Sequence, residues 1–280
     1  MSETIVVGVS ESPVSRRAVD WAIGRAVERR LGMELVSVVG GAVGVVGEKD
    51  VLEAAIRDTR ERLDEHVRRA SDAGIQASGR VETGDPVSVL LEASKNAALL
   101  VIGSDYRGPD AGPARGVHGI RIAAAASSPV VVVPDVDLGD RRGIVVGVDG
   151  SEVSERALAF AAQEADRFGE PLIAVCVWTP LTAHLHGATV RSEVYLTNMQ
   201  ALAEESLALS LAGIAGLYPD LQVERHAERG YPSQVINRHA ATARLAVVGT
   251  HGRGAVGRFL LGSISQEVLT RLVTTTAVVR

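Results

Sequence analysis

The sequence repeats itself, and this duplication constrains the fold more than any other feature. The segment Ile5 to Ala22, IVVGVSESPVSRRAVDWA, is matched by Ile144 to Ala161, IVVGVDGSEVSERALAFA, at an offset of 139 residues. Farther along the offset becomes 146, so that Gly103 matches Gly249. Only two copies are present, each of ordinary domain size. The duplication therefore predicts two tandem domains of one kind rather than a solenoid.

The boundary between the copies is expected within the polar segment 134–143, PDVDLGDRRG, which contains Pro and two Gly. We therefore assign the first domain to residues 1–137 and the second to residues 138–280. Seven extra residues of the second copy are expected in or near 178–193.

Short apolar runs alternate with amphipathic stretches in each copy. Strands are expected at 4–9, 34–39, 75–81, 99–102 and 130–133, and again at 144–148, 172–178, 221–226, 245–248 and 276–279. Helices are expected at 14–30, 50–73, 87–95 and 118–126, and again at 152–168, 193–217, 234–241 and 264–272. Regular βα alternation with all-apolar strands predicts an α/β fold, a mainly parallel sheet with helices on both faces. A hydrophobic content of 46% with only 3% aromatic residues suits strands buried on both sides.

Charge and composition exclude several classes of function. The net charge of −5 does not favour sequence-independent nucleic-acid binding. The single cysteine, Cys176, lies in an apolar run and is expected to be a core residue. No apolar stretch is long enough to span a membrane, and the start, MSETIVVGVS, lacks a signal-peptide core. We expect a cytoplasmic protein with no membrane insertion.

A glycine-rich segment, Gly249 to Ser263 with the sequence GTHGRGAVGRFLLGS, joins an apolar strand to a helix. Glycines let backbone N–H groups approach a phosphate, and a helix start offers its positive end to the same anion. From glycine spacing alone, a flexible surface connection with a serine N-cap is an equally good interpretation.

A second loop of the same copy completes the candidate site. In open parallel sheets, ligands bind beyond the carboxyl ends of the strands, where the strand order reverses. The loop after the first strand of the second copy carries Asp149, and we expect Gly147, Val148 and Asp149 to contact the ligand. A short carboxylate there can accept hydrogen bonds from ribose hydroxyls or an amino group, while the glycine loop takes phosphates.

Taken together, these residues resemble the universal stress protein family. Gly249, Gly252, Gly262 and Ser263 match its ATP-binding pattern, GxxG, nine residues, then G and S or T, and VGVDGSEVSERAL adds to the likeness. The resemblance implies two tandem five-stranded parallel sheets of order 3-2-1-4-5. It also implies that the two halves of the chain pair through their last strands as an intrachain pseudo-dimer. It leaves open whether two chains associate as a homodimer.

The resemblance also implies roles for residues of the second copy. Asp149 would contact the adenosine, the backbone of Val177 would bind adenine, and Gly249 would pack under the ribose. The phosphates would be held by Gly252, Gly262, Ser263 and Ile264, with Mg²⁺ bridging their oxygens. Arg253 and Arg258 could assist, although a solvated loop surface is the plainer interpretation of both arginines.

The first copy departs from the pattern at the positions that carry the chemistry. Ser10 replaces Asp149, Tyr106 replaces Gly252 and Val117 replaces Ser263. Each strong polar contact contributes roughly 1 to 3 kcal/mol, so we predict one ATP per chain, bound by the second domain. The competing hypothesis is a first site with a changed ligand, shaped by Asp105, Tyr106 and Arg107.

Other residues with reactive side chains are explained more simply. His184 and His186, in HLHG, are expected in a plain loop, and Ser151 is expected to cap a helix. No general base or carboxylate pair converges on the glycine loop, so a regulatory ATP-binding protein with protein partners is favoured over an enzyme. A nucleotide-dependent transferase, a flavin-type electron-transfer relative and a structural dimerisation protein are the alternatives.

Overall fold

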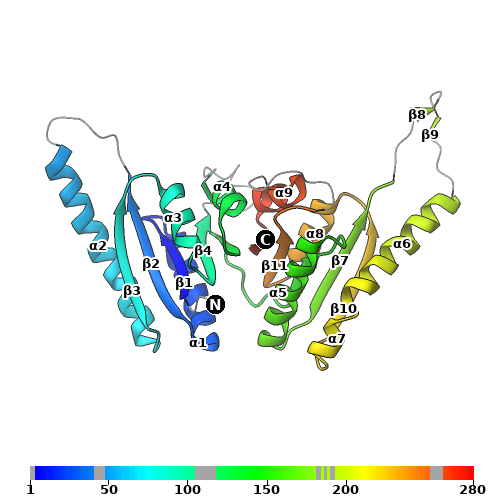
Figure 1. Ribbon diagram of the computed structural model, residues 1–280, viewed down its shortest axis with the longest axis horizontal. Helices are drawn as coiled ribbons and strands as arrows, with labels where there is room; N and C mark the ends of the chain where they lie inside the picture. The colour runs from blue at the N-terminus through cyan, green and yellow to red at the C-terminus, as the bar shows by residue number, and fades with distance from the viewer. Residues whose placement is uncertain are drawn as a thin grey trace. The chain divides into compact units, whose positions relative to one another are not determined.

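The computed structural model describes residues 4–40, 48–104, 118–180, 184–185, 188–189, 193–252 and 261–280. The chain divides into two compact units, Met1–Val136 and Asp137–Arg280 (Figure 1). The division falls one residue before the boundary expected from the sequence.

The first unit is a five-stranded parallel sheet with helices. Its elements are β1 (Thr4–Val9), α1 (Val14–Arg29), β2 (Gly32–Val39), α2 (Glu48–Asp72), β3 (Ala77–Thr83), α3 (Pro86–Ser94), β4 (Leu99–Ser104), α4 (His118–Ala125) and β5 (Val130–Pro134). The strands lie in the order β3-β2-β1-β4-β5, and all adjacent pairs are parallel. This is the predicted order 3-2-1-4-5.

The second unit repeats this architecture. Its elements are β6 (Ile144–Gly147), α5 (Glu152–Phe168), β7 (Leu172–Trp178), β8 (His184–Leu185), β9 (Ala188–Thr189), α6 (Glu193–Leu211), α7 (Ile214–Leu217), β10 (Val223–Arg229), α8 (Pro232–Ala240), β11 (Leu245–Gly249), α9 (Ser263–Arg271) and β12 (Thr275–Val279). Its main sheet has the order β10-β7-β6-β11-β12, again all parallel. The predicted α/β class is confirmed.

Strand register follows the duplication residue by residue. Ile5 pairs with Met33 in the first unit, and Ile144 pairs with Leu172 in the second. Both members of the second pair are displaced by 139 from those of the first. The two sheets therefore bring equivalent positions together at their carboxyl ends.

The central strands form the core of each unit. In β1, the consecutive residues Ile5, Val6 and Val7 are all buried, and in β4 the same holds from Leu99 to Ile102. Successive residues of a strand point to opposite faces, so both faces of these strands are covered. Cys176 is also buried, as expected of a core residue.

The units differ mainly between their second strand and the following helix. In the second unit, this connection carries the short antiparallel hairpin of β8 and β9, in which His184 pairs with Thr189. Of the other histidine in that segment, His186, nothing is described. The helix expected over 193–217 is interrupted after Leu211 and resumes as α7.

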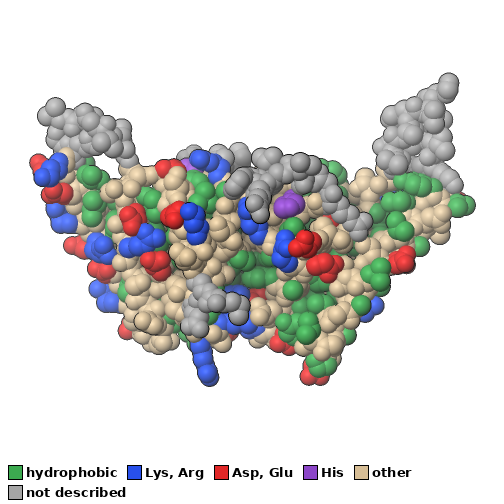
Figure 2. Space-filling view, in the orientation of Figure 1, with side chains coloured by type: hydrophobic (Ala, Val, Ile, Leu, Met, Phe, Trp, Pro, Cys, Tyr) green, Lys and Arg blue, Asp and Glu red, His purple; other side chains and the backbone are tan. Residues whose placement is uncertain are grey.

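No helix among the described residues is both long enough and apolar enough to cross a membrane. On the face seen in Figure 2, acidic and basic side chains are interspersed over both units. That face offers no extended field of basic charge of the kind that tracks a nucleic-acid backbone.

Candidate functional site

Two loops of the second unit meet at the carboxyl end of its sheet. The first loop follows β6 and carries Asp149, whose Oδ1 accepts a hydrogen bond of 2.9 Å from the backbone N–H of Ser151. Ser151 in turn caps α5, accepting from the backbone N–H of Ser154 at 3.2 Å. The predicted capping role of Ser151 is confirmed, and these bonds hold Asp149 in a fixed turn.

The second loop follows β11, and its two described ends are joined by hydrogen bonds. The backbone N–H of Gly262 donates to the carbonyl of Thr250 at 2.7 Å, and Thr250 N–H donates to the carbonyl of Val279 at 2.8 Å. The Ser265 hydroxyl donates to the carbonyl of Gly249 at 2.5 Å. The start of α9 is thus fixed against the end of β11, although residues 253–260 between them, including Arg253 and Arg258, lie outside the described residues.

At two glycines of the second loop, a side chain would fit only if its neighbours moved. A Cβ on Gly252 would lie 2.2 Å from Oδ2 of Asp149, which is far inside van der Waals contact. A Cβ on Gly249 would lie 2.8 Å from a methyl group of Val153. The Asp149 carboxylate therefore occupies space that the glycine loop leaves open. The close approach of Asp149 and Gly252 is the contact by which one loop meets the other.

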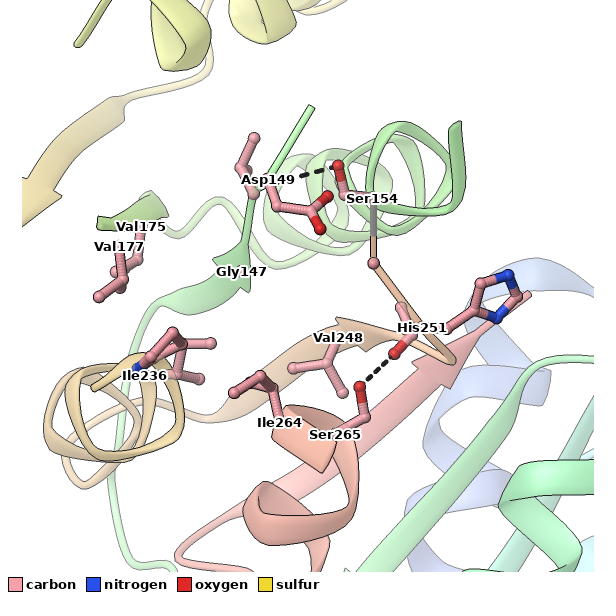
Figure 3. Close-up of a pocket in the computed structure, with 14 residues that line it drawn as sticks. Gly147, Asp149, Ser154, Val175, Val177, Ile236, Val248, His251, Ile264 and Ser265 are labelled. Atoms are coloured by element: carbon pink, nitrogen blue, oxygen red, sulfur yellow. Dashed lines mark hydrogen bonds between the residues drawn. The ribbon is translucent and has the colours of Figure 1, made fainter. Parts of the chain in front are cut away.

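A cavity of about 160 Å³ opens between these loops. Among the residues that line it, apolar side chains come from β7, α8, β11 and α9: Val175, Val177, Ile236, Val248 and Ile264. Figure 3 shows Val175 and Val177 on the left and Ile236, Ile264 and Val248 below, with Asp149 above them. Asp149 is the one carboxylate among the described lining residues. The cavity can therefore hold a flat apolar group and present a negative acceptor to its polar edge.

Ser263 does not cap α9, although a serine N-cap was one interpretation of the sequence. Gly262 is the N-cap residue, without a side-chain cap, and Ser263 is the first residue of the helix, with an exposed side chain. The first backbone bond of the helix runs from Gln266 N–H to the Gly262 carbonyl. The N–H groups of Ser263, Ile264 and Ser265 precede this bond and form the positive end of the helix.

The cavity includes residues that the sequence analysis did not single out. Ser154, Val175, Pro232, Ile236 and Ser265 line it together with the predicted residues Gly147, Val148, Asp149, Val177, Gly249, Gly252 and Ile264. Val175 could have been found from the period of two along β7, because it shares the face of Val177. The contributions of α8 could not, since they depend on how that helix packs against the sheet.

The two helices that line the cavity, α8 and α9, are linked by Glu267. Its carboxylate accepts from the Ser233 hydroxyl at 2.6 Å and from the Tyr231 hydroxyl at 3.0 Å. These hydrogen bonds hold the pKa of Glu267 below its usual range and raise the pKa of Tyr231. The start of α8 is therefore fixed relative to α9 on the same side of the sheet.

The first unit keeps a cavity at the equivalent position. It has a volume of about 290 Å³ and is lined by Val36, Val38, Leu90 and Ile102, the counterparts of Val175, Val177, Ile236 and Val248. Ser10 stands in place of Asp149, and its hydroxyl accepts from Ser12 N–H at 3.3 Å. Ser10 thus reproduces the turn without supplying a negative charge.

The start of α4 differs as well, with His118 and Gly119 in place of Ile264 and Ser265. Tyr106, Val117, Asp105 and Arg107, on which the sequence analysis relied for the first unit, lie outside the described residues.

The chain belongs to the universal stress protein family. The family's model matches it twice, over residues 1–134 and 141–280. A universal stress protein of Mycobacterium tuberculosis strain H37Rv is 32% identical over 281 residues, covering 95% of this chain and 92% of that protein. The duplicated sequence is thus a tandem of two domains of this family.

A solved structure of about the same length agrees with this fold. A universal stress protein from Archaeoglobus fulgidus superimposes with a TM-score of 0.72 at 22% identity, covering 99% of this chain and 98% of the other. A smaller protein of the family from A. fulgidus, solved in complex with dAMP, covers 46% of this chain and 95% of its own, with 21% identity and a TM-score of 0.36.

Proposed function

We propose that the second domain binds ATP and that the protein is a stress-response regulator whose interactions depend on this nucleotide. The observation that carries the proposal is the convergence of Asp149, the glycine loop and the start of α9 on one partly apolar cavity. Adenine is flat and apolar on its faces, ribose offers hydroxyl donors, and phosphates are anions. The cavity supplies a complementary surface for each of these parts.

In this proposal the adenosine part occupies the side of the cavity formed by Val175, Val177 and Ile236. The last hydrogen-bonded pair of β6 with β7 is Gly147 with Val175, whereas β7 continues to Trp178. Val177 thus lies beyond the end of β6, where its backbone can bond to the edge of adenine. Asp149 accepts from the ribose hydroxyls, and Gly249 allows the ribose to approach the backbone.

The phosphates lie toward Gly252, Gly262, Ser263 and Ile264. The N–H groups that precede the first backbone bond of α9 provide donors, and the Ser263 hydroxyl is exposed at the same end. Mg²⁺ bridges the phosphate oxygens and offsets their negative charge, since a helix end alone supplies too little positive charge for three phosphates. Arg253 follows Gly252 directly and supplies a cation to the same loop.

Only one ATP binds per chain in this proposal, in residues 138–280, while residues 1–137 carry the degenerate site. The cavity of the first unit is not filled by side chains, so blockage of the cavity does not explain why ATP would fail to bind there. The reason is chemical: Ser10 lacks the charge of Asp149, and His118 replaces the apolar Ile264. ATP acts as a ligand that stabilises one conformation of the second domain, which other proteins then recognise.

Calorimetric titration of the purified chain with ATP and Mg²⁺ tests the proposal, using a matched pair of variants from the two copies. We expect one site per chain, a loss of affinity of about 5- to 150-fold in Asp149→Ala, corresponding to 1–3 kcal/mol, and wild-type affinity in Ser10→Ala. Mass spectrometry of the freshly purified protein should identify an adenine nucleotide.

Two equivalent sites, or equal losses in Asp149→Ala and Ser10→Ala, would refute the assignment to the second domain. Absence of any ATP binding would refute the function itself.

A further inference from the structure

A second cluster of polar side chains lies in the second unit, between β10 and α8. His226 and Glu228 are two residues apart on β10, so their side chains share one face of that strand, and His239 comes from α8. One potential ligand atom from each of the three lies within 4.8 Å of the others. All three side chains are partly buried, with 33%, 28% and 18% of their surfaces exposed. Solvent can therefore reach the cluster without fully hydrating it.

The three side chains are oriented toward a common point. Nε2 of His239 lies 2.6 Å from Oε1 of Glu228, and Nδ1 of His226 lies 4.0 Å from the same oxygen. The two imidazole rings have their centroids 4.5 Å apart. Two imidazole nitrogens and one carboxylate oxygen thus surround one small volume.

The neighbouring charges contact other atoms of His226 and Glu228. The other nitrogen of His226, Nε2, lies 3.5 Å from Oε2 of Glu224, and the other oxygen of Glu228, Oε2, is paired with the guanidinium of Arg238. In metal sites, a carboxylate commonly accepts the second N–H of a ligating histidine and fixes its tautomer. Glu224 and Arg238 therefore hold His226 and Glu228 in the orientation that a metal requires.

The spacing is close to that of a tetrahedral zinc site. Zinc bonds of 2.0–2.1 Å to nitrogen and oxygen place neighbouring ligand atoms about 3.3 Å apart. The separations of 2.6 Å and 4.0 Å at Glu228 Oε1 bracket this value, so each must change by less than about 1 Å. Side-chain rotations can supply changes of this size without movement of the strand or the helix.

The equivalent positions of the first unit contain no histidine. At the offset of 146, Arg80 stands in place of His226, Glu82 in place of Glu228 and Ala93 in place of His239. Arg80 forms ion pairs with Glu82 at 2.6 Å and with Glu34 at 2.8 Å. An ion pair thus satisfies the glutamate in the first copy, whereas the second copy has two potential metal ligands around it.

We propose that His226, Glu228 and His239 bind one Zn²⁺ ion, which links β10 to α8 in the second unit. Two histidines and a carboxylate are a common zinc ligand set, with the fourth position left to water. The site is separate from the proposed nucleotide cavity, as none of its ligands lines that cavity. Because the metal joins two elements of the folded unit, its binding stabilises the fold.

Titration of chelator-treated full-length protein with Zn²⁺ in the absence of nucleotide tests this proposal. We expect one Zn²⁺ per chain and at least a hundredfold weaker binding in His226→Gln, Glu228→Gln and His239→Gln. Glu224→Gln, which removes only the partner of a ligand, should weaken binding 10- to 100-fold. Co²⁺ in place of Zn²⁺ should give a visible absorption spectrum of a four- or five-coordinate ion, and this spectrum should be lost in His239→Gln.

Two controls separate this site from other histidines. His66→Gln, in the first unit, and the double variant His184→Gln/His186→Gln should both bind Zn²⁺ as the unmodified chain does. The proposal is overturned if the double variant abolishes binding or if the three ligand variants keep wild-type affinity. It is also overturned if the protein binds no Zn²⁺, in which case the cluster is a set of ion pairs only.

Discussion

Residue 30 and its counterpart in the second copy, Gly169, hold the same backbone conformation with different side chains. Arg30 has φ 54° and ψ 45°, and Gly169 has φ 59° and ψ 37°, both in the left-handed region at the end of a helix. In each case the backbone N–H closes the helix by donating to carbonyls three and four residues earlier. Glycine adopts this conformation without strain, whereas in other residues steric strain destabilises the folded state by roughly 1 kcal/mol or more.

We therefore predict opposite effects of exchanging these residues. Arg30→Gly should raise the free energy of unfolding by up to about 1 kcal/mol, and Gly169→Ala should lower it by a similar amount. A Cβ at Gly169 has no heavy atom within 4 Å, so the loss reports backbone strain alone. Thermal denaturation should show Tm shifts of a few degrees in opposite directions. A lower Tm for Arg30→Gly would contradict this explanation.

A second prediction at the level of residues concerns the contact between Gly252 and Asp149, and it rests on the proposed function. Gly252→Ala places a methyl group where the Asp149 carboxylate lies, and this side chain can rotate away. We expect ATP affinity to fall by about as much as in Asp149→Ala, while the fold is kept. Because both variants remove the same carboxylate from the cavity, their effects should not add in the double variant.

Calorimetric titration of the two single variants and the double variant measures this coupling. Additive losses would mean that Gly252 acts independently of Asp149. The first copy is consistent with coupling, since the aspartate and the glycine are replaced together there, by Ser10 and Tyr106.

At the level of elements, the helices α3 and α8 are equivalent but begin differently. Asp85 caps α3, accepting from the Ser88 N–H at 2.9 Å and the Ser88 hydroxyl at 2.7 Å. Its counterpart, Tyr231, makes no side-chain cap to α8 and instead donates to Glu267. The first unit thus stabilises this helix locally, while the second links it to α9 beside the cavity.

The cap of α3 predicts a pH dependence of stability. The side-chain and backbone hydrogen bonds from Ser88 lower the pKa of Asp85 in the folded chain. A lowered pKa means that the stabilisation is complete above the unfolded value, about 3.9, and is lost as pH falls through the folded value. Asp85→Asn should therefore be less stable than the unmodified chain at pH 6, and the difference should shrink below about pH 4. A difference that stays constant from pH 6 to pH 3 would exclude this cap as its source.

The sequence predicted the elements well where the apolar pattern is strong. The strands 4–9 and 172–178 and the helix 152–168 agree with the structure in both bounds. The third strand of each copy begins two residues later than expected, at Ala77 and Val223. Both are edge strands with mixed polar sequences, and the apolar Ile75 that suggested an earlier start is buried before the strand begins. Local pattern cannot separate such a residue from the strand.

The sequence predicted the cavity-lining residues that belong to a motif. It did not predict those that reach the cavity only through the packing of helices on the sheet. Gly249 and Gly252 were predicted from the glycine motif, and a Cβ at either position would meet neighbouring atoms. Asp149 was predicted from its place after the first strand of the second copy. Ile236 and Pro232 were missed because any apolar residue on that helix face looks like core in the sequence. Ser265 was missed because its hydroxyl bonds to Gly249, a partner 16 residues away in the chain.

At the level of the whole molecule, the duplication makes each domain an internal reference for the other. The two units share strand order and register and both contain a cavity at the same place, but the two cavities offer different side chains to a ligand. If the proposed function is correct, ATP should stabilise only the second unit, because a ligand stabilises the state to which it binds. The free energy of local unfolding can be measured separately for segments of each unit, so the two units can be compared within one chain.

Hydrogen exchange measured by mass spectrometry, with and without ATP and Mg²⁺, tests this asymmetry. We expect slower exchange in peptides covering 147–154, 245–252 and 261–271, and unchanged exchange in the equivalent peptides covering 8–15, 99–104 and 118–125. The Asp149→Ala variant should lose the protection at the same ATP concentration, since its site is then largely empty. Equal protection of both sets would mean that the open cavity of the first unit also binds the nucleotide, because the two sets of peptides lie at equivalent places in equivalent folds.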